Sequence, residues 1–257
     1  FLYKNRLPDY KNVTYHNRGD GIPIHEITQN LGKFSLNQES FCSIERVPTA
    51  FVKLTIQNNT DEPLCDTVSM IARTAPEFDL IGCMEPDGYY EPEPSVYRWM
   101  IHPLWEHTEG KITDGNYDLY YQHDDKVSCD YEDYYFVHFN FSLAPREETT
   151  VYCAFGRGAL VPDFSYEAEK SKTEAFWNVE LEKIRDFPKK EDPYFFAMYR
   201  SLVAQGLQMF SYPKGVNYVL LRQGGLQRKL WPTDIRSMIR ALARASAHAG
   251  AAFVRYR

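Results

Sequence analysis

The residue types best suited to chemistry gather in one short segment near the end of the sequence. They are an aromatic ring, two guanidiniums, an amide and a carboxylate: Arg222, Gln227, Arg228, Trp231 and Asp234. A sugar ring offers apolar C–H faces and a rim of hydroxyls, so a sugar site combines an aromatic platform with charged groups that form strong hydrogen bonds. Gly224 and Gly225 allow the backbone to turn tightly or to approach a ligand. The segment is therefore a candidate carbohydrate-binding site.

The same residues have a structural alternative. In that interpretation Trp231 is a core residue, and Asp234 is a first-turn acid favoured by the dipole of the helix that follows it. Arg222 or Arg228 is then an ordinary surface partner. The concentration of aromatic, charged and amide groups within so short a segment favours the binding site.

Two other clusters carry metal-ligating residue types. One contains His102, Glu106, His107 and Glu109, and the other contains Asp124, Asp125, Asp130, Glu132 and Asp133. The first lacks the His-Glu-x-x-His spacing of a helical zinc site, and the second lacks the spacing and the glycine of a calcium-binding loop. We interpret the first cluster as structural histidines and the second as a solvated acidic loop.

Nucleophilic and cofactor chemistry have weaker support. The five cysteines are Cys42, Cys65, Cys83, Cys129 and Cys153. No two of them form a Cys-x-x-Cys pair, which argues against a zinc site and a disulfide framework and favours buried thiols. Neither Cys83 nor Cys129 has an identifiable partner base, and the sequence has no glycine-rich phosphate loop. We therefore predict no metal and no cofactor.

Composition and charge limit the partners. The 257 residues include 29 Lys and Arg against 35 Asp and Glu, a net charge of −6, and 44% are hydrophobic. This balance describes a folded, mildly acidic protein and argues against nucleic acid as a partner. The apolar runs are too short for a membrane span. The cysteine usage favours a cytoplasmic protein, while the Asn-x-Ser/Thr sequences at Asn12, Asn58 and Asn140 keep a secreted origin as the alternative.

The spacing of apolar residues changes near Pro162, from the alternation of strands to the three- and four-residue spacing of helices. Before it, apolar and polar residues alternate along Val52–Ile56 and Val68–Met70, which we expect to be neighbouring antiparallel strands, and again along Tyr134–Leu143. Strands with no helical pattern between them predict an antiparallel β-sandwich, which we place at residues 1–163. The acidic, proline-rich stretch Ala75–Asp133 interrupts the strands and is predicted to be an ordered loop that covers one sheet.

After Pro162 the spacing is helical. A charged connector helix with an apolar stripe at Trp177, Leu181 and Ile184 is predicted within residues 164–190. Residues 191–257 then hold an apolar helix over Phe195–Phe210 and another helix that begins near Asp234. These helices cannot bury so much apolar surface among themselves. We therefore expect them to begin a larger helical domain, completed elsewhere in the same chain or by another chain.

A β-sandwich, a connector helix, an apolar helix and a helix that opens with Trp-Pro-x-Asp follow one another in six-hairpin glycosidases. This order, with the local sequence of residues 221–234, resembles the N-terminal part of that group, which includes glucoamylase-like enzymes and disaccharide phosphorylases. The resemblance implies a supersandwich-like sandwich followed by the first helices of an (α/α) barrel. It also implies that Trp231 and Asp234 bind sugar, whereas Thr233 stands where glucoamylase-like members carry Arg.

The resulting function hypothesis is the N-terminal part of a glycoside hydrolase of multi-domain α and β architecture. The resemblance implies that the general acid and its partner lie beyond Arg257, so the catalytic residues are unknown and this chain alone is expected to be inactive. One alternative is a disaccharide phosphorylase of the same architecture. Another is a non-catalytic carbohydrate- or protein-binding sandwich, whose aromatic platform would be formed by loop residues Tyr89, Tyr90, Tyr97, Trp99 and Trp105. A homo-oligomer is left open.

Overall fold

The chain divides into two compact units, which we describe separately. The computed structural model describes residues 3, 10–16, 18–45, 49–71, 106–108, 110–113, 118–132, 136–156, 163–182, 192–208, 210–211 and 220–221. The sandwich unit comprises residues 1–16 and 24–170, and the helical unit comprises residues 17–23 and 171–257. Within the described residues, no helix is long and apolar enough to cross a membrane.

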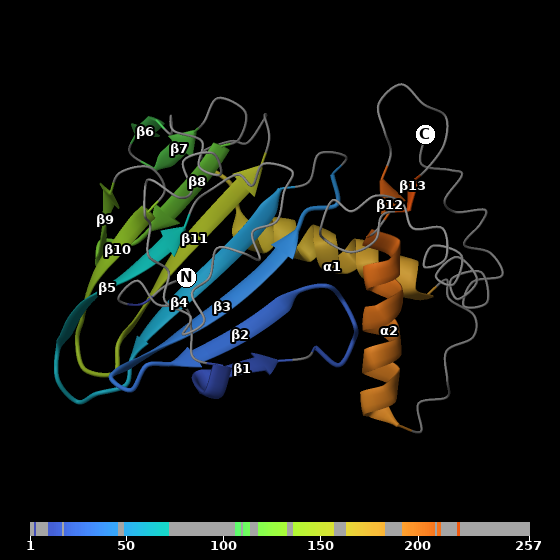
Figure 1. Ribbon diagram of the computed structural model, residues 1–257, viewed down its shortest axis with the longest axis horizontal. Coiled ribbons are helices and arrows are strands. Elements are labelled where there is room, and N and C mark those ends of the chain that lie inside the picture. Colours follow the sequence, from blue (N-terminus) through green and yellow to red (C-terminus); the bar gives the residue numbers. More distant parts are fainter. Residues whose placement is uncertain are drawn as a thin grey trace, which may run out of the picture. The chain divides into compact units, whose positions relative to one another are not determined.

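The sandwich unit contains two antiparallel sheets (Figure 1). The large sheet has eight strands in the order β1 (Val13–His16), β2 (His25–Asn30), β3 (Phe34–Cys42), β4 (Ala50–Asn58), β11 (Glu148–Gly156), β8 (Asp118–His123), β7 (Lys111–Thr113) and β6 (Glu106–Thr108). The small sheet has three strands in the order β5 (Leu64–Ile71), β10 (Phe136–Leu143) and β9 (Val127–Glu132). A short 3-10 turn, Tyr10–Asn12, precedes β1.

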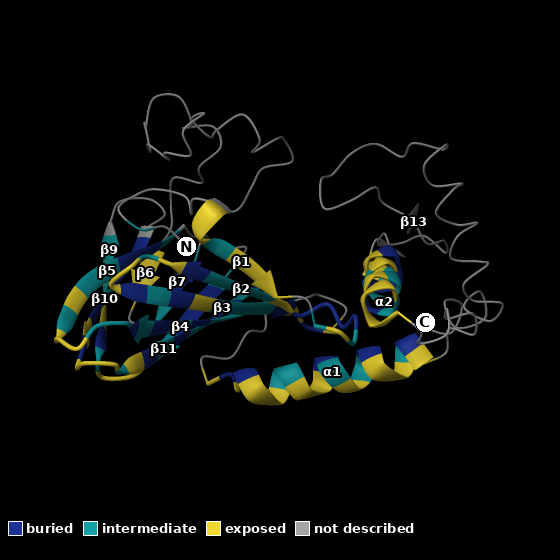
Figure 2. Cartoon of the chain, turned by 90° about the horizontal axis from the view of Figure 1, so that it is seen from below, coloured by how far each residue is buried: buried dark blue, intermediate teal, exposed yellow. Residues whose placement is uncertain are grey.

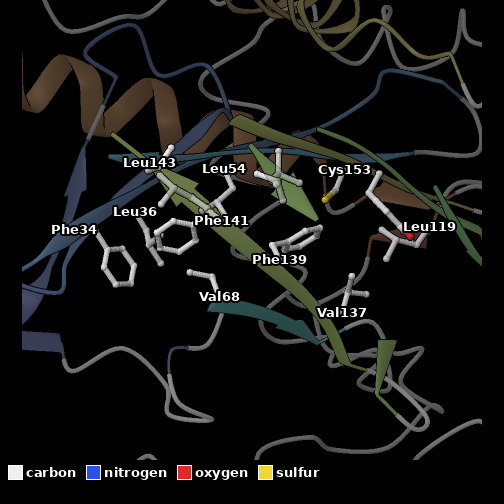
Figure 3. Close-up of a cluster of buried hydrophobic side chains, with 14 of the residues drawn as sticks. Phe34, Leu36, Leu54, Val68, Leu119, Val137, Phe139, Phe141, Leu143 and Cys153 are labelled. Atoms are coloured by element: carbon white, nitrogen blue, oxygen red, sulfur yellow. The ribbon is translucent and has the colours of Figure 1, made fainter. Parts of the chain in front are cut away.

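One apolar cluster joins the two sheets. Successive side chains of a strand point to opposite faces, and those of β10 and β4 that face the other sheet are the ones that are buried. Phe139 on β10 and Ile56 on β4 have no exposed surface, and Leu54 is 1% exposed. Figure 3 shows Val68 and Phe139 of the small sheet among large-sheet residues that include Leu36. The predicted antiparallel β-sandwich is therefore confirmed.

The expected pairing of the strands around residues 52–56 and 68–70 is wrong. β4 lies in the large sheet between β3 and β11, whereas β5 lies in the small sheet and pairs with β10. The turn after Asn58 therefore carries the chain from one sheet to the other, and it is not a hairpin. The turn between β10 and β11 also connects the two sheets.

Asn58 holds these two sheet-to-sheet connections together. Its side chain is completely buried, and its amide nitrogen donates to the carbonyls of Glu62 at 2.8 Å and Ala144 at 2.9 Å. Its side-chain oxygen accepts from the backbone N–H and the hydroxyl of Thr60. The backbone N–H of Asn58 donates to the Glu147 carbonyl at 2.9 Å. This asparagine thus satisfies backbone groups of both connections, which would otherwise be buried without partners.

Two of the three predicted helices, the connector helix and the apolar helix, are present in the described part of the chain. α1 spans Tyr166–Glu182 and α2 spans Pro193–Gln208. Of the predicted stripe on α1, Trp177 and Leu181 are buried, and Ile184 lies outside the described residues. Figure 2 shows buried and exposed positions alternating along α1. Asp192 caps α2 through hydrogen bonds from two backbone N–H groups of its first turn, and Pro193 occupies the first helical position.

The segment between β1 and β2 belongs to the helical unit. Arg18 donates to Glu174 on α1 at 2.6 Å and to Asp20 at 2.8 Å. Gly21 and Ile22 are buried. Gly21 has a φ of +73°, and a Cβ at that position would lie 2.2 Å from the Cβ of Arg200 on α2. The glycine therefore allows this segment to pass against the backbone of α2.

Two short strands end the described part of the helical unit. β12 (Phe210–Ser211) pairs with β13 (Leu220–Leu221) in an antiparallel ladder. The predicted third helix lies outside the described residues. The predicted (α/α) barrel therefore stays a prediction.

Candidate functional site

The predicted sugar-binding residues follow β13 directly. β13 ends at Leu221. Arg222, Gln227, Arg228, Trp231 and Asp234 all lie outside the described residues. Their arrangement therefore stays a prediction, and the loop residues Tyr97 and Trp99 lie outside the described part as well.

In the described part, polar side chains concentrate on the outer face of the large sheet, the face that points away from the small sheet. Strand register places them in two rows that cross the strands. The charged row is His16, Glu26, Glu39, Lys53, Tyr152 and Gln122, on β1, β2, β3, β4, β11 and β8. The hydroxyl row beside it is Thr14, Thr28, Asn37, Thr55 and Thr150, on β1, β2, β3, β4 and β11.

The start of α1 packs over part of the charged row. Lys170 donates to Glu39 at 2.6 Å, and the Tyr166 hydroxyl donates to the same carboxylate at 3.0 Å. Burial, followed by the charge of Glu39, raises the pKa of the Tyr166 phenol above its ordinary value, so it remains a donor. Lys53 forms an ion pair with Glu167 at 3.3 Å and lies 5.8 Å from the centre of the Tyr152 ring. Both lysines of this region are therefore paired with carboxylates.

The hydroxyl row carries a directed chain of hydrogen bonds. The Thr28 hydroxyl donates to the Asn37 side-chain oxygen at 2.8 Å. It lies 2.8 Å from Nε2 of His16. Since the single hydroxyl hydrogen of Thr28 is directed at Asn37, Nε2 of His16 donates to the threonine oxygen. The hydroxyls of Thr55 and Thr150 are 3.5 Å apart.

Two hollows meet on this face. One, of about 340 Å³, is lined by residues of β1 to β4 and by Glu167 and Lys170 of α1. The other, of about 590 Å³, is lined by residues of β8, β11 and the turn after β8. Thr55 and Lys53 line the first, whereas Thr150 and Tyr152, their direct partners in register, line the second. The two hollows therefore adjoin on the same face of the sheet, and we call them together the outer groove.

Sequence analysis missed the outer groove. Its residues are spread over six strands, and only the register brings them together. The available signal was the alternation of Lys53 and Thr55 with Val52, Leu54 and Ile56, whereas Glu26 and Thr28 lie in a strand whose other residues are mostly polar. Alternation shows that a polar face exists, but it does not show which strands are neighbours.

His107 lies on β6 and makes protein contacts. Its Nε2 is 2.7 Å from the Tyr121 hydroxyl, and its ring stacks on Tyr131 at a centroid distance of 5.0 Å. These contacts agree with the structural interpretation of this histidine. His102 and Glu109, of the same cluster, lie outside the described residues.

The acidic cluster around β9 also makes structural contacts. A side-chain oxygen of Asp124 accepts from the Lys126 backbone N–H at 3.0 Å and from the Thr149 hydroxyl at 2.7 Å. Asp130 accepts from the Asn140 amide at 2.6 Å. Across the described residues, no group of three or more His, Cys, Asp or Glu side chains is arranged to hold a metal ion.

The described thiols should differ sharply in reactivity. Burial raises the pKa of Cys129 and that of Cys153 to about 12, so neither forms the reactive thiolate at neutral pH. Cys65 is exposed. We expect iodoacetamide to label Cys65 in the native protein but to label Cys129 and Cys153 only in urea, as read by peptide mass spectrometry. Rapid labelling of Cys153 in the native protein would contradict its place in the core.

Comparisons with known proteins give only distant likenesses. No family model matches the sequence, and no curated protein matches it. One similar solved structure is described as "Putative kojibiose phosphorylase from human microbiome", with 11% identity and a TM-score of 0.49 over 81% of this chain and 30% of that chain. Another is a family GH92 α-mannosidase from Bacteroides thetaiotaomicron, with 9% identity and a TM-score of 0.25 over 75% of this chain and 26% of that chain. At these scores neither structure carries information on the activity of this chain, which spans less than a third of either.

Proposed function

We propose that the chain is the N-terminal part of a carbohydrate-active enzyme, a glycoside hydrolase or a disaccharide phosphorylase, in which Trp231 and Asp234 bind sugar. The observation that carries the proposal is the sugar-binding set of residues in the segment that follows β13. The order of elements adds support. The sandwich, the charged α1 and the apolar α2 come in the order that six-hairpin glycosidases are known for.

The proposed roles follow from the chemistry of a sugar. The Trp231 indole stacks on an apolar ring face, and the Asp234 carboxylate accepts hydrogen bonds from ring hydroxyls. Arg222 and Arg228 donate to sugar oxygens, as does the side-chain amide of Gln227. In the hydrolase form of the proposal, one carboxylic acid protonates the leaving oxygen and a carboxylate activates water for direct inversion. We assign neither of these catalytic groups to a residue of this chain.

Binding of the purified chain to a panel of neutral oligosaccharides tests the proposal. Stacking and charge-assisted hydrogen bonds each contribute about 1 kcal/mol or more, so Trp231→Ala and Asp234→Asn should each weaken binding roughly tenfold. Trp231→Phe is the matched control, because it keeps an aromatic platform and should bind nearly as the unchanged chain does. If neither Trp231→Ala nor Asp234→Asn weakens the binding of any oligosaccharide in the panel, or if none of them binds, the proposed roles are overturned.

Product analysis of the enzyme that contains this chain then separates the two reactions. A hydrolase releases free sugar in the absence of phosphate. A phosphorylase requires phosphate and releases a sugar phosphate. An enzyme with neither activity on any glycoside, whose chain binds glycans all the same, would favour the non-catalytic module.

A further inference from the structure

We propose that the outer groove binds an extended, uncharged oligosaccharide. This would be a second carbohydrate site, formed by the sandwich strands and separate in sequence from Arg222–Asp234. It does not depend on the proposed enzymatic activity. The inference rests on the length of the groove, the chemistry of its floor and its balance of charge.

The length of the groove fits a chain and not a single sugar. The hydroxyl row crosses five strands, from Thr14 on β1 to Thr150 on β11. At about 4.8 Å between neighbouring strands, four steps extend over about 19 Å. The two hollows adjoin at the middle of this row, because Thr55 lines one, Thr150 lines the other, and the two residues are directly paired.

The floor offers hydrogen bonds without charge. The hydroxyl row consists of threonines and one asparagine, and each of these side chains can both donate and accept. Asn37 is exposed, and its amide nitrogen makes no hydrogen bond to the described residues, so it is ready to donate to a ligand. The hydrogen bonds between His16 and Thr28 and between Thr28 and Asn37 fix the orientation of the Asn37 side chain before a ligand binds. Such preorganisation reduces the entropic cost of binding.

The charges of the groove argue against anionic ligands. Lys53 and Lys170 are already paired with Glu167 and Glu39. Among the described residues, the carboxylate of Glu26 has no ion pair or hydrogen bond, so it leaves a net negative charge on the floor. An acidic polymer would be repelled by this carboxylate, whereas sugar hydroxyls can donate to it.

The outer groove is also better suited to bind a sugar than to bind an apolar protein surface. The cores of protein interfaces are apolar and poor in charged residues, whereas both rows of this floor are polar apart from the ring of Tyr152. That ring lies near the middle of the groove, where it lines the larger hollow. It packs against the Tyr166 ring at a centroid distance of 5.4 Å, and its exposed part offers a small apolar contact for a sugar.

Binding of neutral and acidic oligosaccharides of increasing length tests the inference. The probes are malto-, cello- and manno-oligosaccharides from disaccharide to octasaccharide, with oligogalacturonates of the same lengths as the acidic set. Affinity measured by titration calorimetry should rise with length for at least one neutral series and should be absent for the acidic set. The double variant Thr28→Val/Asn37→Leu should lower the affinity for the longest bound oligosaccharide at least tenfold.

Two control variants keep the two proposed sites distinguishable. Ser128→Ala changes an exposed residue of the small sheet and should leave binding and the melting temperature unchanged. In Trp231→Ala, the weaker site after β13 should lower the overall affinity, but affinity should still rise with oligosaccharide length. If Trp231→Ala abolishes all binding and the groove variant, still folded by circular dichroism, binds normally, the outer groove is excluded and the segment after β13 is supported. Preferred binding of the acidic set, or no binding of any neutral series, would also overturn the inference.

Discussion

Replacement of Gly21 by alanine is expected to destabilise the helical unit by about 3 kcal/mol. The backbone of Gly21 has a φ of +73°, which costs an alanine about 1–2 kcal/mol. The new Cβ would also lie 2.2 Å from the Arg200 Cβ and 2.9 Å from backbone atoms of Arg200 and Ser201, which cannot move aside as a flexible side chain could. Overpacking of this kind costs about 1–3 kcal/mol. Thermal denaturation should show a melting temperature lower by about 6–12 °C.

Two other glycines separate the causes of this effect. Gly32 has a φ of +82° and no atom within 4 Å of its would-be Cβ, so Gly32→Ala measures the backbone strain alone. Gly19 has neither the strain nor the neighbours, so Gly19→Ala should leave stability almost unchanged. If Gly21→Ala is no more destabilising than Gly32→Ala, the close approach of residues 17–23 to α2 is wrong. Hydrogen exchange of the α2 amides would locate the loss.

Replacement of Asn58 by alanine is expected to cost the sandwich unit about 3 kcal/mol. The variant removes the donor to the Glu62 and Ala144 carbonyls and the acceptor of the Thr60 N–H. Each buried group left without a partner costs about 1–3 kcal/mol. Water that partly enters the site would reduce the total destabilisation, since the site lies where two turns meet. Urea denaturation followed by intrinsic fluorescence measures the change.

The neighbouring asparagine provides the matched control. The side chain of Asn59 makes only two long hydrogen bonds, at 3.4 Å to the Ser35 hydroxyl and to the Gly32 carbonyl. Asn59→Ala should therefore change the free energy of unfolding by no more than about 0.5 kcal/mol. Asn58→Asp keeps the shape and the acceptor but places oxygens against two carbonyls, so it should destabilise at least as much as Asn58→Ala. Equal stability of the Asn58→Ala and Asn59→Ala proteins would contradict the bridging role of Asn58.

The sequence predicted local structure where the periodicity is clear, but it was wrong over residues 75–133, which were expected to be a loop and contain β6, β7, β8 and β9. Alternation along Val52–Ile56 identified the buried side of β4 because the period of a strand is set by backbone geometry. The partner of a strand depends on contacts distant in sequence, and the turn formers after Asn58 are compatible both with a hairpin and with a crossing between sheets. In the folded chain, the crossing is bridged by a hydrogen bond from Asn58 to Ala144, 86 positions away.

The same difference between local and long-range contacts explains which candidate site could be predicted from the sequence. The residues from Arg222 to Asp234 could be recognised because they lie in one continuous segment. The outer groove could not, because His16, Lys53 and Gln122 come from strands far apart in the chain. The helices were simpler, since Trp177 and Leu181 recur at the spacing of one helical turn.

The membership of residues 17–23 in the helical unit has a consequence for modularity. The helical unit is discontinuous in sequence, because part of it comes from the connection between β1 and β2. A gene cut after Lys170 would separate Glu174 from its partner Arg18, and it would remove the buried Ile22 from the unit that contains it. The sandwich and the helices therefore cannot be exchanged between proteins by a single recombination event. They must be inherited together, or be engineered with residues 17–23 transferred alongside the helices.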